Sequence, residues 1–110
     1  MRRGDVWTVS GTGYAGKPRP AVPAVIVQDD RFDATASVTL CAFTTDETEA
    51  ALIRLPVISN ERNGVQTVSR LMIDKITTVS KTRLGRRLGR LDDADIVRLN
   101  RAILVFLGLA

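Results

Sequence analysis

The spacing of turn residues limits the possible folds of this chain more than any other sequence feature does. From Asp5 to Thr78, short alternating or β-branched runs are separated by glycine, proline, asparagine or aspartate. A period of two predicts strands, and strands this short and this closely spaced predict a small barrel or sandwich. The expected strands are residues 5–10, 22–28, 37–43, 52–55, 65–68 and 70–78.

Three features separate these strands. The glycine-rich residues 11–16 predict a loop, Pro56 is expected to stop the fourth strand because proline cannot donate to a central ladder, and Asn63-Gly64 predicts a tight turn.

The pattern changes to a helical period near the C-terminus. Asp92 is a plausible N-cap, and apolar residues then recur at helical spacing up to Gly108, so residues 92–107 predict one helix. Residues 102–107 are apolar on every side. Such a run needs cover from its own barrel or from a second subunit, which favours a homodimer.

Length and hydropathy indicate a single domain, residues 1–110. The chain is 45% hydrophobic and 25% charged, as in ordinary soluble proteins. Its longest apolar runs are too short to span a membrane, and residues 1–5 have no apolar stretch resembling a signal peptide. We therefore expect a cytoplasmic protein without a membrane partner.

The chain contains no histidine and a single cysteine, Cys41. This composition excludes an intramolecular disulfide, a cysteine-built zinc site and every nucleophile activated by histidine. Catalysis would have to use carboxylates, Arg, Lys, Ser, Thr or Tyr. We expect neither a metal nor a cofactor.

Basic residues exceed acidic ones by 16 to 12, and six of them, with no acidic residue between, lie in residues 75–90. A surplus of this kind is compatible with a polyanion such as nucleic acid. The basic run is either a solvated face or a surface that contacts phosphates.

Several motifs together resemble a known family. They are Arg3-Gly4-Asp5-Val6-Trp7, Lys17-Pro18-Arg19-Pro20 before an aliphatic strand, Cys41-Ala42-Phe43-Thr44-Thr45, Asp74-Lys75-Ile76-Thr77-Thr78, and the closing Leu-Gly-Arg-Leu with its helix. Their order over essentially the whole chain resembles the MazF/PemK toxins. The resemblance implies a mainly β fold with a C-terminal α-helix, namely a small SH3-like or PemK-type (CcdB-like) barrel that is usually a homodimer. It also implies a sequence-specific, metal-independent endoribonuclease that cleaves single-stranded RNA and is neutralised by an antitoxin protein.

The chemistry of RNA agrees with this implication. When the RNA 2′-hydroxyl attacks the adjacent phosphate, an enzyme needs to orient it, move protons and stabilise charge. Arg19 suits the last role because a guanidinium offers a rigid fork of donors, and Pro18 and Pro20 restrict the backbone beside it. The other interpretation is that Arg19 is a surface residue at a strand start.

A threonine is implied as the partner of Arg19. Thr44 matches the family pattern and could donate a hydrogen bond to the scissile phosphate. Thr45 would face the other way and is the second candidate for catalysis or RNA contact. A structural threonine with good strand propensity is the alternative.

Asp74 has three possible roles: catalytic residue, acceptor for RNA or structural carboxylate. In PemK-type relatives an arginine stands two residues before this aspartate, but Met72 occupies that position here. Arg70, two residues further back on the same face, is one possible substitute. The general base stays open.

Further RNA contacts are expected from Tyr14, Lys17, Arg70, Lys75 and Arg86. Tyr14 lies in the glycine-rich loop, which could cover an RNA groove and offer a ring for stacking. Lysine and arginine would attract the backbone independently of sequence.

One departure from the family concerns Pro23, since Pro20-Ala21-Val22 is repeated as Pro23-Ala24-Val25. Pro23 could bulge the strand and move Arg19 relative to Thr44, which would reduce activity. Alternatively, the strand begins after Pro23 and the extra residues lengthen the loop.

Two other functions are compatible with such a barrel. A CcdB-like toxin binds and inhibits DNA gyrase through its C-terminal helix, and a non-catalytic module would keep only the basic face for binding RNA. Arg19 and Thr44 favour the nuclease over both.

Overall fold

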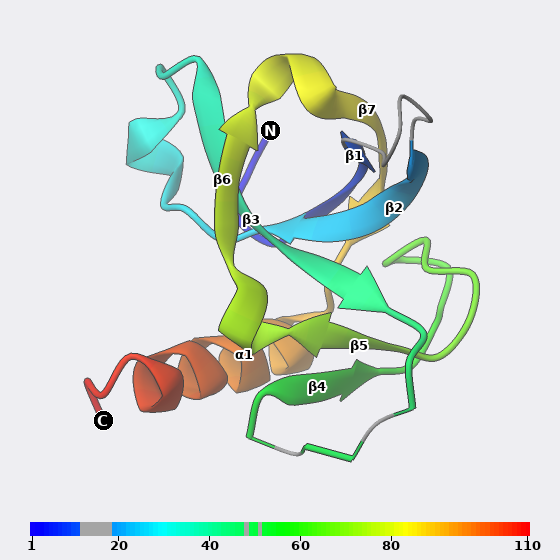
Figure 1. Cartoon of the computed structure of the whole chain (residues 1–110), viewed down its shortest axis with the longest axis vertical. Coiled ribbons are helices and arrows are strands. Elements are labelled where there is room, and N and C mark those ends of the chain that lie inside the picture. The colour runs from blue at the N-terminus through cyan, green and yellow to red at the C-terminus, as the bar shows by residue number, and fades with distance from the viewer. Residues whose placement is uncertain (12–18, 48, 51) are drawn as a thin grey trace.

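The computed structural model describes residues 1–11, 19–47, 49–50 and 52–110, except for the side chains of Arg19 and Pro20. Tyr14 and Lys17 therefore lie outside the described residues. The strands and the helix of the described part are β1 (Asp5–Gly11), β2 (Arg19–Ile26), β3 (Ser37–Thr44), β4 (Arg54–Val57), β5 (Ser69–Met72), β6 (Thr77–Ser80), β7 (Leu84–Arg90) and α1 (Asp93–Phe106) (Figure 1). Short 3₁₀ turns are η1 (Asp30–Phe32), η2 (Ile73–Lys75) and η3 (Lys81–Arg83). The prediction of a mainly β fold with one C-terminal helix is confirmed.

All strands pair antiparallel in the order β4-β5-β3-β2-β1-β7, and β6 also pairs with β3. The first part of β3 pairs with β2 and β6, whereas its end pairs with β5. Figure 1 shows the result: β3 crosses from the upper strands to the lower pair β4 and β5, and α1 passes behind this pair and extends to its left.

Two hydrophobic clusters cover opposite faces of this sheet. Val25 and Cys41 contribute to a cluster that includes Leu99 of α1, whereas Ala24 and Leu40 contribute to a second cluster. The side chains of neighbouring residues in one strand therefore point to opposite faces and belong to different clusters. Burial on both faces explains why the β2 sequence reads as a continuous apolar run rather than an alternating one.

The prediction that Pro56 stops the fourth strand was wrong. Pro56 lies inside the strand, opposite Arg70 of β5. Because β4 is at the edge of the sheet, a residue without an N–H group is tolerated there. The Pro56 carbonyl accepts a hydrogen bond from Arg98 Nη1 of α1 at 3.0 Å, so this edge is covered by the helix.

The predictions of strands at residues 65–68 and 70–78 were wrong. Residues 65–68 are irregular, and the second segment divides into β5, η2 and β6. The fully buried Asn63 explains the first error, because its Oδ1 accepts hydrogen bonds from the backbone N–H groups of Val65 (3.0 Å) and Asn60 (3.1 Å). Its Nδ2 donates to the Ile58 carbonyl at 2.9 Å. These bonds replace the ladder that a strand would need.

The basic run contains a strand, β7, that pairs with β1. Its two Leu-Gly-Arg repeats have a steric reason. An added Cβ would lie 2.3 Å from Thr8 Oγ1 at Gly85 and 2.1 Å from the Arg62 carbonyl oxygen at Gly89. Glycine therefore lets β7 approach both β1 and the turn around Asn63.

Pro23 lies within β2, opposite Thr8, so the interpretation that the strand starts after Pro23 is wrong. The register of β1 and β2 shifts instead between the pairs Val9–Val22 and Gly11–Arg19. The ladder between β2 and β3 ends at Ala24, next to Pro23. Beyond that point β2 keeps its pairing with β1 alone, and β3 turns toward β5.

The helix follows the prediction closely. Asp92 is the N-cap residue, although its side chain accepts from Asn60 Nδ2 (3.0 Å) rather than from the first helical turn. Gly108, with φ +74°, ends α1, and the Leu109 N–H donates to the Leu104 carbonyl at 2.8 Å. Among the described residues, no helix is long and apolar enough to cross a membrane.

The last part of α1 leaves apolar side chains exposed. The exposed residues are Leu104, Val105, Phe106, Leu107 and Leu109, while Leu99 is fully buried. Figure 1 shows this end of the helix extending past the sheet. The barrel therefore covers the first turns of α1 and leaves the last ones uncovered.

Replacing Asn63 with alanine is expected to lower the free energy of unfolding by about 1–3 kcal/mol, because buried backbone groups would lose their partners. Urea unfolding followed by circular dichroism measures this loss. Asn100→Ala, at an exposed position of α1, is the matched control and should change stability by less than about 0.5 kcal/mol. Equal stability of the two variants would contradict a structural role for Asn63.

Candidate active site

Thr44 and Thr45 leave β3 on opposite sides. Thr44 is half-buried and lies opposite Arg70 of β5. Its Oγ1 accepts a hydrogen bond from the backbone N–H of Asp46 at 3.2 Å. Thr45 is exposed and lines a cavity together with Pro23 and Ser69. The expected alternation of the two threonines is therefore present.

Arg19 is the first residue of β2, and its backbone lies opposite Gly11 of β1. Because β2 and β3 are antiparallel neighbours, the start of β2 and the finish of β3 lie toward the same end of the sheet. The backbone of Arg19 and the residue Thr44 are therefore at the same end, although β3 leaves β2 after Ala42 and pairs with β5 there.

Arg70 holds the segment that follows Thr44. Its Nη1 donates to the Asp46 carbonyl at 3.2 Å, and its Nη2 lies 3.7 Å from a Glu49 carboxylate oxygen. The Arg70 side chain is only 19% exposed, whereas that of Glu49 is 91% exposed. The guanidinium therefore lies beside Thr44 on the same face and braces the backbone around Asp46.

The arginine that pairs with Asp74 is Arg54, a residue that the sequence reasoning missed. Arg54 Nη1 forms a hydrogen-bonded ion pair with Asp74 Oδ1, and both side chains are largely buried, at 16% and 24% exposure. Arg54 lies directly opposite Met72 in the ladder of β4 and β5. The guanidinium is thus supplied from the neighbouring strand, and Arg70 does not replace it.

Cys41 belongs to the buried cluster that includes Leu99 and is a neutral hydrogen-bond donor. Burial raises the pKa of its thiol to about 12, and Sγ donates to the Met72 carbonyl at 3.3 Å. At neutral pH such a thiol is protonated, so Cys41 is not a nucleophile here.

A second cavity, of about 230 Å³, lies on the same face as Thr44 and Arg70. It is lined by alternate residues of β3 and β5, Ala42 and Met72, together with Val22 and Lys75. Lys75 is exposed at its rim. The predicted RNA contact Lys75 is therefore on the side of Thr44.

The basic run divides into paired and unpaired cations. Arg87 and Arg90 lie 3.4 and 3.7 Å from the buried carboxylate of Asp5, and Arg83 Nε donates to the Ser10 carbonyl at 2.7 Å. Within the described part of the chain, the Arg86 guanidinium has no such partner; its backbone N–H donates to Thr8 Oγ1 at 2.9 Å. The run is neither wholly a solvated face nor wholly free for phosphates.

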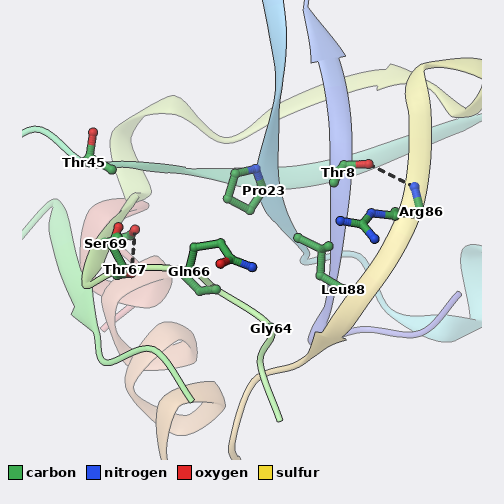
Figure 2. Close-up of a pocket in the computed structure, with 10 residues that line it drawn as sticks. Thr8, Pro23, Thr45, Gly64, Gln66, Thr67, Ser69, Arg86 and Leu88 are labelled. Atoms are coloured by element: carbon green, nitrogen blue, oxygen red, sulfur yellow. Dashed lines mark hydrogen bonds between the residues drawn. The ribbon is translucent and has the colours of Figure 1, made fainter. Parts of the chain in front are cut away.

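The cavity beside Thr45 has a volume of about 280 Å³ and is shown in Figure 2. Pro23 lies above it, Leu88 and Gly64 close its lower side, and Gln66 and Arg86 point toward each other across it. Gln66 was not predicted from the sequence, because residues 65–68 were expected to form a strand.

Comparison with known proteins identifies the family. Residues 2–107 match the model of the PemK-like, MazF-like toxins of type II toxin–antitoxin systems. This chain is a member of that family. It is 55% identical over 111 aligned positions to a probable endoribonuclease MazF of Mycolicibacterium smegmatis, an alignment that covers 100% of this chain and 99% of the relative.

Solved structures of MazF toxins share the fold. A mycobacterial endoribonuclease in complex with its cognate antitoxin has a TM-score of 0.80 and 26% identity, covering 100% of this chain and 97% of that chain. A MazE–MazF structure from Deinococcus radiodurans has a TM-score of 0.81 at 15% identity, covering 100% and 98%, and shows the shared fold alone. The resemblance to MazF/PemK toxins inferred from the motifs is thus confirmed.

The ion pair of Arg54 and Asp74 is expected to stabilise the fold. Arg54→Gln should lower the free energy of unfolding by about 1–3 kcal/mol, because it leaves a largely buried carboxylate without its partner. Arg31→Gln removes an exposed pair with Asp29 and should cost less than about 0.5 kcal/mol. Urea denaturation of both variants measures the difference; equal effects would mean that the Arg54 pair contributes no more than a surface pair.

Proposed function

We propose that Arg19 and Thr44 form the catalytic centre of a metal-independent endoribonuclease that cleaves single-stranded RNA. Family membership and 55% identity to a probable endoribonuclease MazF make the protein the toxin of a type II toxin–antitoxin system and an endoribonuclease. The observation that supports the residue assignment is that Arg19 begins β2 and Thr44 ends β3, so that both lie at the same end of these antiparallel strands.

The reaction uses the nucleophile of the substrate. The 2′-oxygen forms a bond to the adjacent phosphorus, the bond from phosphorus to the 5′-oxygen breaks, and the products are a 2′,3′-cyclic phosphate and a 5′-hydroxyl. The 2′-hydroxyl loses a proton and the leaving 5′-oxygen gains one. The Arg19 guanidinium stabilises the charge that develops on the phosphate oxygens.

The hydroxyl of Thr44 is suited to donate to the same phosphate. Since Oγ1 already accepts from the Asp46 N–H, its hydrogen is directed away from that bond. Arg70 fixes the Asp46 backbone and thereby the orientation of Thr44. Asp74 holds Arg54 and is assigned a structural part in this site, and the general base is not assigned to any residue.

Other residues contribute binding along the RNA. Lys75 lies at the rim of the cavity on the Thr44 side and provides a cation for the backbone. Tyr14 and Lys17 are retained as proposed RNA contacts from the segment between β1 and β2. A sequence-independent contribution from these cations should weaken as salt increases.

The protein partner proposed for this chain is an antitoxin. Two of the similar solved structures are toxins in complex with an antitoxin or with MazE. An acidic and apolar segment of the antitoxin would occupy the RNA groove and pair with cations there. We propose that the protein acts in the cytoplasm, where cellular RNA is found.

We also propose that the protein is a homodimer. Exposed apolar residues are concentrated at the end of α1, and removing apolar surface from water drives association. Family membership supports the same assembly.

Inhibition of gyrase is the less favoured function. The family model and the similar solved structures are those of MazF-like and PemK-like toxins, and the proposed site pairs an arginine with a threonine, as a nuclease rather than a gyrase inhibitor would need. A module that only binds RNA would not need Thr44 to be oriented by Asp46.

Cleavage tests the catalytic assignment. Incubated with a long single-stranded RNA in EDTA, the protein should produce discrete cuts that end in a 2′,3′-cyclic phosphate and a 5′-hydroxyl. Arg19→Ala and Thr44→Ala should each lower the rate by about a hundredfold or more, because each removes a donor to the transition state. Arg31→Ala, an exposed arginine on η1, is the control and should cleave normally. Unchanged cleavage in the Arg19 or Thr44 variant would refute the assignment; intact RNA with inhibited gyrase would favour the CcdB-like function.

Assembly is tested by a charge in the exposed end of α1. Phe106→Asp should convert the dimer into a monomer, as measured by sedimentation velocity, because a carboxylate would be buried unpaired at the interface. Phe32→Asp, at a phenylalanine that is 60% exposed on η1, is the matched control and should leave the dimer intact. A wild-type monomer at micromolar concentration would contradict the proposal.

A further inference from the structure

The cavity beside Thr45 has the features of a binding site, and no role has been assigned to it. It is lined by Thr8, Pro23, Thr45, Gly64–Thr67, Ser69, Arg86 and Leu88, and its volume is about 280 Å³. This is just below the range for small-molecule sites, which is about 300–1,000 Å³. The space therefore suits one planar ring system rather than an extended segment of chain.

The walls of this cavity are fixed by the fold. Gly64, with φ +68°, packs so tightly on β7 that an added Cβ would lie 2.2 Å from the Leu88 carbonyl oxygen. Asn63 fixes the start of the same wall through its hydrogen bond from the Val65 N–H. On the other side, the Arg86 N–H donates to Thr8 Oγ1. The site is thus largely formed before any ligand binds.

Its polar groups are available. Figure 2 shows the Gln66 amide and the Arg86 guanidinium directed toward each other between Pro23 and Leu88. Neither side chain has a hydrogen bond or an ion pair to the described residues, in contrast to Arg83, Arg87 and Arg90 of the same basic run. The Gln66 and Arg86 side chains thus lie beside apolar walls without partners among the described residues, and they are suited to form hydrogen bonds with the polar edge of a ring.

We infer that this cavity binds one unstacked guanine base of the RNA and sets the sequence at which the chain is cut. Pro23 and Leu88 offer apolar surfaces against which the faces of an unstacked base can pack. Arg86 can only donate, and guanine presents two acceptors, O6 and N7, on one edge. Gln66 can both donate and accept, so it is suited to the remaining edge of the base.

The position of the cavity connects recognition with cleavage. Thr45, on its rim, is the residue directly after Thr44, and Ser69 stands next to Arg70 in β5. A base held here would belong to a nucleotide close to the phosphate at Thr44. The inference rests on the proposed nuclease function, but base binding itself does not require cleavage.

Binding can therefore be tested separately from catalysis. The wild-type protein is mixed with a randomised pool of 2′-O-methyl RNA hexamers, which lack the nucleophile, and the bound sequences are determined. Guanine should be enriched at one position. Gln66→Ala and Arg86→Met should reduce that enrichment by about five- to a hundredfold, the discrimination typical of a good bidentate contact. Arg101→Met, which removes an exposed arginine of α1 remote from the cavity, should leave it unchanged.

Three results would overturn the inference. The first is a wild-type protein that binds the pool with no preferred base, and the second is a preference that both cavity variants retain in full. The third is equal loss of affinity for every sequence in Arg86→Met, which would mean that Arg86 contacts phosphate only. Mapping the cuts of the same variants on long RNA adds the catalytic readout: changed cut sites support the inference, whereas a wild-type protein that enriches guanine but cuts nothing would refute the proposed function alone.

Discussion

The structure depends on how β3 divides its pairing between two groups of strands. Its first part pairs with β2 and β6, and its end pairs with β5. The ladder to β2 ends at Ala24, beside a proline that has no N–H group to contribute. The end of β3 is consequently free to leave β2, and the two cavities lie on either face of the region where it does so. Pro23, which from the sequence could have moved Arg19 relative to Thr44, thus lies at the point where β3 separates from β2.

Burial on both faces of the sheet explains which parts of the fold could be predicted. The strands predicted at residues 5–10, 22–28 and 37–43 and the helix could be predicted because their apolar residues follow a strand or helix pattern clearly. The irregular segment at 65–68 was not, because one buried side chain, Asn63, replaces a ladder that the apolar pattern seemed to require. Strand β7 was not predicted, because Arg86 and Arg87 interrupt the apolar pattern that usually indicates a strand. It pairs with β1 through backbone hydrogen bonds, which do not depend on that pattern.

The candidate site was predictable where it depends on chain direction and unpredictable where it depends on register. Antiparallel pairing of the predicted strands 22–28 and 37–43 would place Arg19, shortly before the first, and Thr44, just after the second, at the same end of the sheet. That Arg54 would pair with Asp74 depends on the alignment of two four-residue strands, in which a shift of one residue would turn Arg54 to the other face. The bias of the charges was visible in the sequence, but which arginines are neutralised by Asp5 and which stay unpaired is decided by the register of β1 and β7.

The alternation of side chains at the end of β3 separates two tasks that a sequence-specific nuclease must combine. Thr44 and Arg70 face one side, and Thr45 and Ser69 face the other. In the function proposed for this chain, catalysis would take place on one face, where groups contact the phosphate that every nucleotide shares, and recognition on the opposite face, where groups contact a base. Because the adjacent residues Thr44 and Thr45 would carry the two tasks, the backbone would fix the distance between the selected base and the cleaved bond. Substitutions at Gln66, on the irregular segment, would then change the selected sequence without moving Thr44.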